Sequence, residues 1–138
     1  MMLSLNRQTD YACRILLHLA TCGGRTTARE IARQQFVPHA LARRIVTQLA
    51  NAHLVITARG REGELELARP PSEISMLDVI EAIEGPLAPD CCTLYPQACD
   101  AIAGSAAREA WTQACAAVVA ELKGITLDKL SGGFPNLC

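Results

Sequence analysis

Two short helix patterns and a hairpin pattern follow one another closely in the first half of the chain, and this order constrains the fold most. Thr27 and Glu30 form a capping box, in which a hydroxyl and a carboxylate satisfy free backbone amides at a helix start. After a short turn, Pro38 is placed to open the next helix. Strand patterns at 55–58 and 64–67 then enclose a glycine-bearing turn. We therefore predict a mostly α-helical fold with a small β-hairpin.

The second of these helices is predicted to have one buried and one exposed face. Leu41, Ile45 and Leu49 recur at four-residue spacing and should face the core. The opposite face carries small, polar and arginine side chains, namely His39, Ala40, Arg43, Arg44, Thr47 and Asn51. Two short helices joined by a tight turn, with such a face on the second, form a helix-turn-helix that fits the major groove of DNA. Arg43 and Arg44 are then candidate contacts to guanine edges or phosphates, although a charged helix face is more often only solvated.

A hairpin directly after a helix-turn-helix is typical of a wing. Its tip carries Arg59 and Arg61, which could reach the phosphate backbone or a narrow minor groove. The competing interpretation is an ordinary hairpin, and the nearby Glu62, Glu64 and Glu66 favour it. The order and spacing of the elements favour the wing.

The charge is divided unevenly along the chain. Residues 1–69 carry ten arginines against five acidic residues, a net charge of +5, whereas residues 70–138 carry three basic against nine acidic residues, a net charge of −6. An arginine-rich half beside an acidic half suggests that only the first faces a polyanion.

The composition indicates a cytoplasmic protein that is not an enzyme. No apolar stretch approaches the roughly 18 residues of a membrane span, and no signal-peptide pattern opens the sequence, so we expect no membrane partner. Seven cysteines in a helical, leucine-rich chain are expected to be reduced thiols. The three histidines do not pair with a nucleophile or with metal-ligand spacing.

Two further helices are predicted in the second half. Ser75 and Asp78 form a capping box for a helix that Gly85 and Pro86 end. A longer helix over 105–123 carries a seam on one side, formed by Trp111, Cys115, Val118 and Leu122. Such a seam suits a homodimer, because a winged helix binds a palindromic site best as a pair, but a helix folded back on its own domain fits the periodicity equally well.

The chain is thus expected to have three parts. Residues 1–86 form a winged helix-turn-helix domain, residues 87–104 a cysteine-bearing sensor loop, and residues 105–138 a dimerisation helix with a tail.

The sensor loop holds Cys91, Cys92 and Cys99, and thiolates can provide a DNA-binding module with an iron or redox input. A zinc site is an alternative, but the usual second cysteine pair is absent; thiol switching needs only two of the three. The other cysteines have plainer interpretations. Cys13, Cys22 and Cys115 lie on helix patterns and are expected to be small buried hydrophobic residues, while Cys138 belongs to the tail.

Six segments spread along the chain give a further signal, namely Thr9–Ala12, Thr27–Ala32, Arg59–Gly60, Leu67–Pro70, Leu77–Leu87 and Ile125–Leu130. In sequence and order they closely resemble the bacterial IscR/NsrR-type regulators. The resemblance covers almost the whole chain. It implies a dimeric winged-helix transcription factor, in which three loop cysteines and one other ligand hold a [2Fe-2S] or [4Fe-4S] cluster that responds to iron, nitric oxide or redox stress.

The resemblance also implies a set of ligands. Cys92, or its neighbour Cys91, and Cys99 fall at the first two cysteine positions of the family, whereas Ser105 stands at the third. A serine hydroxyl is a poor iron ligand, so the cluster is expected to be labile or absent. Asp10 matches the acidic ligand that the partner subunit provides in the nitric-oxide-sensing branch; without the resemblance, a helix cap is the better interpretation of Asp10.

We therefore expect a repressor whose affinity for a palindromic operator is controlled by an iron-sulfur cluster in the loop 91–105. The expected DNA contacts are Thr27, His39, Ala40, Arg43, Arg44, Thr47, Arg59 and Arg61. One alternative is a cluster-free regulator of the same fold, switched by thiol oxidation, a small effector or a partner protein. Another is an iron-sulfur or thiol redox carrier.

Overall fold

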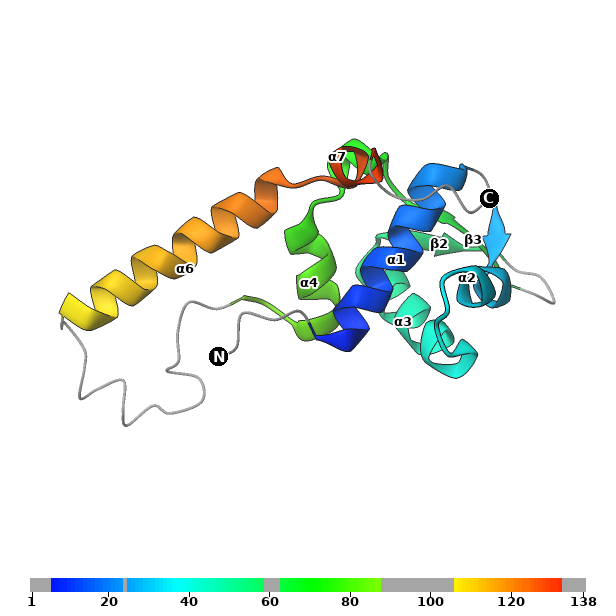
Figure 1. Cartoon of the computed structure of the whole chain (residues 1–138), viewed down its shortest axis with the longest axis horizontal. Coiled ribbons are helices and arrows are strands. Elements are labelled where there is room, and N and C mark those ends of the chain that lie inside the picture. The colour runs from blue at the N-terminus through cyan, green and yellow to red at the C-terminus, as the bar shows by residue number, and fades with distance from the viewer. Residues whose placement is uncertain (1–5, 24, 59–62, 88–105, 133–138) are drawn as a thin grey trace.

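The computed structural model describes residues 6–23, 25–58, 63–87 and 106–132. They form a helical body from which one long helix projects (Figure 1). The helices are α1 (Arg7–Cys22), α2 (Ala28–Gln34), α3 (His39–Asn51), α4 (Met76–Glu84), α6 (Ala106–Gly124) and α7 (Leu127–Ser131). The strands are β1 (Thr26–Thr27), β2 (Val55–Thr57) and β3 (Glu64–Leu67), and a short 3-10 turn, η1, covers Pro71–Glu73. The predicted mostly helical fold with a small β element is confirmed.

The sheet has one strand more than the sequence predicts. Its order is β1-β3-β2, and both pairings are antiparallel. Strand β1 is only two residues long and pairs Thr26 with Leu65 and Thr27 with Glu64. Because β1 runs directly into α2, it joins the hairpin to the start of the helix-turn-helix.

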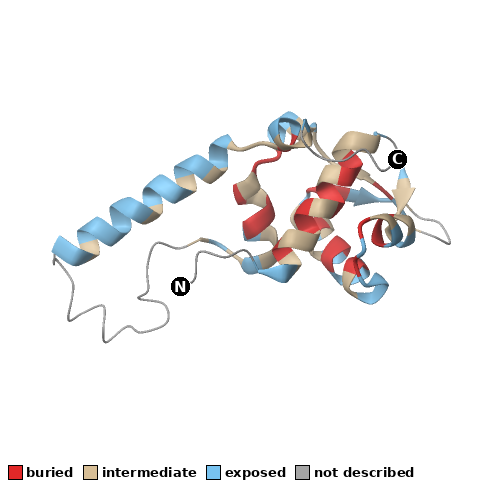
Figure 2. Cartoon of the chain, viewed as in Figure 1, coloured by how far each residue is buried: buried red, intermediate tan, exposed pale blue. Residues whose placement is uncertain are grey.

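Helix α1 lies at the centre of the body and carries much of the core (Figure 2). Its fully buried Leu16 is joined in the core by Ile45 and Leu49 from α3 and by Val79 from α4. The buried side of α3 differs slightly from the prediction, since Ala42 and Val46 are buried with Ile45 and Leu49 whereas Leu41 is only half-buried. The difference arises because a strict four-residue spacing drifts around a helix of 3.6 residues per turn.

The sequence pattern predicts a first helix from about Asp10 to Cys22, and helix α1 begins three residues earlier, at Arg7. Asn6 is its N-cap, and the Asn6 side chain accepts a hydrogen bond of 3.1 Å from the backbone N–H of Gln8. The interpretation of Asp10 as a helix cap is therefore wrong, because Asp10 lies inside the first turn.

Helix α4 has the predicted ends. The Ser75 hydroxyl accepts from the Asp78 amide at 3.2 Å, and the Asp78 carboxylate accepts from the Ser75 amide at 2.9 Å, so the capping box is complete. Gly85 closes the helix with a φ of 87°, a conformation that favours glycine.

Helix α6 projects from the body, and α4 is its main contact (Figure 1). None of its residues is buried within the described chain. The chain then returns to the body, where the backbone N–H of Leu127 donates to the Ile74 carbonyl at 3.0 Å and the Leu127 side chain is fully buried. The C-terminal end of α6 is thus held to the body by the residues that follow it, whereas the rest of the helix is exposed.

Candidate nucleic-acid interface

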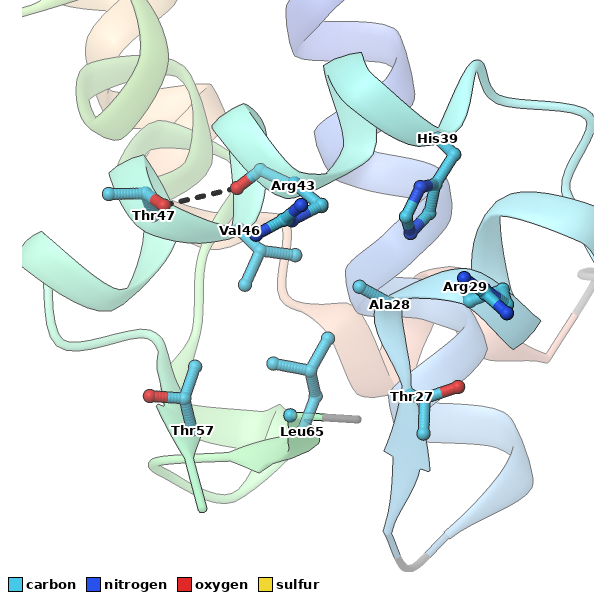
Figure 3. Close-up of a pocket in the computed structure, with 10 residues that line it drawn as sticks. Thr27, Ala28, Arg29, His39, Arg43, Val46, Thr47, Thr57 and Leu65 are labelled. Atoms are coloured by element: carbon cyan, nitrogen blue, oxygen red, sulfur yellow. Dashed lines mark hydrogen bonds between the residues drawn. The ribbon is translucent and has the colours of Figure 1, made fainter. Parts of the chain in front are cut away.

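The exposed face of α3 has the predicted composition. His39, Ala40, Arg43, Arg44, Thr47 and Asn51 are all exposed. Packing of the opposite face against α1 and α4 forces these side chains outward, since a helix with one apolar stripe turns its polar side to solvent. The Thr47 hydroxyl donates to the Arg43 carbonyl at 3.1 Å, the bond drawn dashed in Figure 3.

A groove of about 570 Å³ runs beside this face, between α3, the start of α2 and the sheet (Figure 3). It is lined by Thr27, Ala28, Arg29, His39, Arg43, Val46, Thr47, Thr57, Gly63 and Leu65. Four of the predicted contacts, Thr27, His39, Arg43 and Thr47, therefore share one concave surface. Ala40 and Arg44 are exposed but do not line it.

Two polar residues of this groove, Arg29 and Thr57, are not among the predicted contacts. Arg29 is exposed in the first turn of α2, within the predicted capping box of Thr27 to Glu30, and that position was the available signal. Thr57 reaches the groove through the pairing of β2 with β3, where Thr57 lies opposite Leu65. No local pattern in the sequence indicates that placement.

The capping box at the start of α2 is only half formed. The Thr27 hydroxyl accepts from the Glu30 amide at 3.2 Å, as predicted. The Glu30 carboxylate instead accepts from Arg33 at 2.6 Å and from Gln34 at 2.7 Å. The hydrogen bond from Arg33 lowers the pKa of Glu30. These stronger charge-assisted partners within the helix explain why the carboxylate does not reach back to Thr27.

A buried polar contact supports the turn between α2 and α3. Gln35 is the C-cap residue of α2, and its Nε2 lies 3.2 Å from Nδ1 of His18 in α1. The His18 side chain is only 3% exposed, and this burial lowers the pKa of its imidazole. The next residue, Phe36, has a φ of 56°. The contact between His18 and Gln35 thus holds the turn between α2 and α3 against α1.

The predicted metal ligands are mostly outside the described residues. Cys91, Cys92, Cys99 and Ser105 lie there, as do the wing-tip residues Arg59 and Arg61. Asp10 is described: it is half exposed and pairs with Arg14 at 2.9 Å. The described parts of the chain hold no cluster of three or more His, Cys, Asp or Glu side chains suited to a metal ion.

The described cysteines differ in environment. Cys13 is buried and donates to the Met76 sulfur at 3.7 Å, and burial raises the pKa of its thiol to about 12, so its prediction as a small hydrophobic residue is confirmed. Cys115 is only half-buried, so the prediction that it is buried is wrong; α6 has no buried residue within the described ranges. Cys22, expected to be a buried and reduced thiol, is half-buried and disulfide-bonded.

None of the helices in the described ranges is both long and apolar enough to cross a lipid bilayer.

A helix-turn-helix followed by a small sheet, with an arginine-bearing face on its second helix, defines the winged-helix class of regulators. The model of the Rrf2 family, iron-dependent transcriptional regulators, matches residues 5–132. The chain belongs to the Rrf2 family, and the predicted resemblance to IscR/NsrR-type regulators is confirmed.

Two related sequences match the chain over different lengths. An HTH-type transcriptional regulator of Mycobacterium tuberculosis is 41% identical over 86 residues, which cover 61% of this chain and 53% of that protein. The match thus spans about half the length of that relative. Protein aau3 of Rhizobium meliloti is 33% identical over 135 residues, covering 96% of this chain and 88% of the relative.

Solved structures share the fold over nearly the whole chain. CymR, the global cysteine regulator of B. subtilis, is 29% identical with a TM-score of 0.80, covering 97% of this chain and all of its own. IscR of T. potens is 25% identical with a TM-score of 0.71, covering 93% of this chain and 85% of its own.

Proposed function

We propose that this chain is a transcriptional repressor that binds double-stranded DNA through α3, the start of α2 and the wing. One observation carries the proposal: Arg29, His39, Arg43 and Thr47 line a single groove beside the sheet. Phosphate contacts from arginine and hydroxyl groups would position the duplex, and side chains near the start of α3 would contact base edges. Ala40 and Arg44 on the same helix face, and Arg59 and Arg61 of the wing, complete the proposed interface.

The repressor acts as a homodimer on a palindromic operator. Trp111 and Val118 of α6 are 47% and 44% exposed, seven positions apart and therefore on the same side of the helix. A helix that projects with apolar side chains uncovered suits pairing with the same helix of a second copy. Two-fold symmetry would then place two α3 helices against two half-sites.

The cysteine segment controls the affinity for the operator. Helix α4 would transmit a structural change in this segment to α3. Helix α4 contacts both α1 and α3, and it ends at Glu84, shortly before the segment 88–105. A change in the segment that shifts α4 would alter the position of α3 and so change operator affinity.

The ligand set proposed for an iron-sulfur cluster is Cys92 or Cys91, Cys99, and Asp10 of the partner subunit. Asp10 fits this role, since its carboxylate is half exposed and held by a single arginine. Ser105 does not fit as a ligand, so Cys91, beside Cys92, or Cys115 would have to supply the missing thiolate. When bound, such a cluster supplies reactivity toward nitric oxide and oxidants.

A second candidate is a regulator of the same fold without a cluster, controlled by thiol oxidation or by a partner protein. Ser105 at the position of a ligand cysteine favours it, as does the similarity to CymR, named as a global cysteine regulator. A small effector would fit the same scheme.

Anaerobic iron-sulfur reconstitution of the purified protein, followed by an absorption spectrum and DNA-binding measurements before and after nitric oxide, tests these proposals. We expect a coloured protein that nitric oxide bleaches, with a change in operator affinity, and a more stable cluster in Ser105→Cys. A colourless protein that changes operator affinity when Cys92 and Cys99 are oxidised would establish the cluster-free regulator. A coloured protein without salt-dependent DNA binding would instead establish a redox carrier.

A further inference from the structure

Arg25 lies between two glutamates of the wing. Its Nη1 is 3.8 Å from an Oε2 oxygen of Glu64, and its Nε is 3.5 Å from an Oε2 oxygen of Glu66. All three side chains remain substantially exposed to solvent. One guanidinium therefore contacts two carboxylates. In the sequence, these two glutamates are among the residues that favour an ordinary hairpin over a wing.

The strand register explains this placement. Strand β1 pairs Thr26 with Leu65, so Arg25, one residue earlier, stands opposite Glu66 and diagonal to Glu64. Glu64 and Glu66 are alternate residues of β3 and thus lie on the same side of the sheet. The two ion pairs extend a strand pairing that is otherwise only two residues long.

These ion pairs join the two chain segments that carry facing walls of the groove, although Arg25, Glu64 and Glu66 do not line the groove themselves. Thr27 and Arg29 line it from the start of α2, whereas Gly63 and Leu65 line it from the wing. Arg25 lies two residues before Thr27 in the first wall. Its partners Glu64 and Glu66 are the sequence neighbours of Leu65 in the second wall. The ion pairs thus link the segment before α2 to the wing and can hold the spacing between them.

We propose that Arg25 is a positioning residue for DNA binding, which holds the wing at a fixed distance from the start of α2 through Glu64 and Glu66. The inference rests on the proposed role of the wing and α3 in binding the duplex. It assigns the glutamates a function as well, because they anchor the wing instead of only repelling phosphates. An arginine that simply contacts a phosphate is the rival explanation.

The two explanations differ in how the charges combine. If the charges act independently, Glu64→Gln/Glu66→Gln removes two negative charges and strengthens DNA binding, and Arg25→Gln costs the same factor in either background. If the charges hold the wing, Glu64→Gln/Glu66→Gln gains nothing, and the loss caused by Arg25→Gln shrinks in that background.

The experiment measures fluorescence anisotropy of a labelled random-sequence DNA duplex with the full-length protein over a salt series. We expect Arg25→Gln to weaken binding about threefold, the size typical of exposed ion pairs. The charge exchange Arg25→Glu/Glu66→Arg keeps the net charge and should recover most of the loss. Glu73→Gln/Glu84→Gln removes two exposed acids that neither line the groove nor pair with Arg25; it is the matched control and should strengthen binding slightly.

Limited trypsin digestion of the free protein gives an independent readout. Cleavage after Arg59 and Arg61 should be faster in Arg25→Gln and in Glu64→Gln/Glu66→Gln, and near the wild-type rate in the charge exchange. Equal cleavage rates in all variants, or tighter DNA binding by Glu64→Gln/Glu66→Gln, would overturn the positioning role.

The variant Arg43→Gln/Arg44→Gln separates this inference from the proposed function. If it binds the duplex as the wild type does, the proposed interface itself is wrong. If it loses binding while the Arg25 and glutamate variants behave as independent charges, only the positioning role is wrong.

Discussion

Helices α3 and α6 both carry apolar side chains at three- or four-residue spacing, but α3 packs this side into the core and α6 does not. The apolar side of α3 is buried, with Ile45 and Leu49 fully inaccessible, and its exposed side is polar and basic. Helix α6 has no buried residue, and its exposed side includes Trp111 and Val118. An exposed basic face suits a polyanion, whereas an exposed apolar face suits another protein surface. We therefore propose that α3 binds DNA and that α6 pairs with a second copy of the chain.

The largest expected effect concerns the buried side of α3. Leu49→Ala should lower the free energy of unfolding by about 3 kcal/mol, because it leaves a cavity in the core. Val118→Ala on α6 should change it by less than about 1 kcal/mol at low protein concentration, where dimerisation contributes little. Urea unfolding of both variants measures the difference. Equal losses would show that α6 belongs to the monomer core.

The exposed side of α3 should matter for DNA and not for folding. Arg43→Gln/Arg44→Gln should weaken duplex binding by at least about tenfold and reduce its salt dependence, because each arginine contributes a charged contact. Its urea midpoint should remain that of the wild type. Arg7→Gln/Arg14→Gln, two arginines outside the groove, is the matched control. If the control variant weakens binding as much as the α3 variant does, the arginines of α3 contribute only through the overall charge of the protein and not through a specific contact.

The exposed side of α6 should matter for assembly. Trp111→Asp should convert the dimer to a monomer in sedimentation experiments, since a carboxylate would be buried without a partner in the paired helices. Gln113→Asp, on the other side of the same helix, should leave the dimer intact. Operator affinity should fall with the dimer. A Trp111→Asp protein that stays dimeric would show that the subunits meet elsewhere.

Local signals predicted the helix-turn-helix well, and long-range contacts could not be predicted. The capping box of Ser75 and Asp78 and the polar face of α3 depend on neighbours in sequence, so both were identified. Strand β1 is too short to show periodicity, and its partner β3 lies far along the chain. The contact of Arg25 with Glu66 and the entry of Thr57 into the groove depend on that pairing. The position of the exposed polar face of α3 was therefore predictable, but the shape of the groove beside it was not.

The smallest expected effect concerns the turn that positions α3. Burial lowers the pKa of His18 in the folded protein, so the unfolded chain binds a proton there more readily. The free energy of unfolding should therefore be constant above the ordinary pKa of 6.5 and fall as the pH drops below it toward the folded-state pKa. The loss is limited to about 1.4 kcal/mol per pH unit for one proton. Urea unfolding of wild type and His18→Gln between neutral and mildly acidic pH measures it, and an unchanged slope in His18→Gln would assign the dependence to other groups.

Hydroxyl-radical footprinting on an operator selected from random duplexes tests the assignment of α3 to DNA and α6 to a second copy most directly. Two copies joined through α6 should protect two half-sites related by two-fold symmetry and separated by about one helical turn or a multiple of it. Trp111→Asp should protect one half-site weakly, and Arg43→Gln/Arg44→Gln neither. A single asymmetric footprint of the wild type, unchanged in Trp111→Asp, would contradict the account.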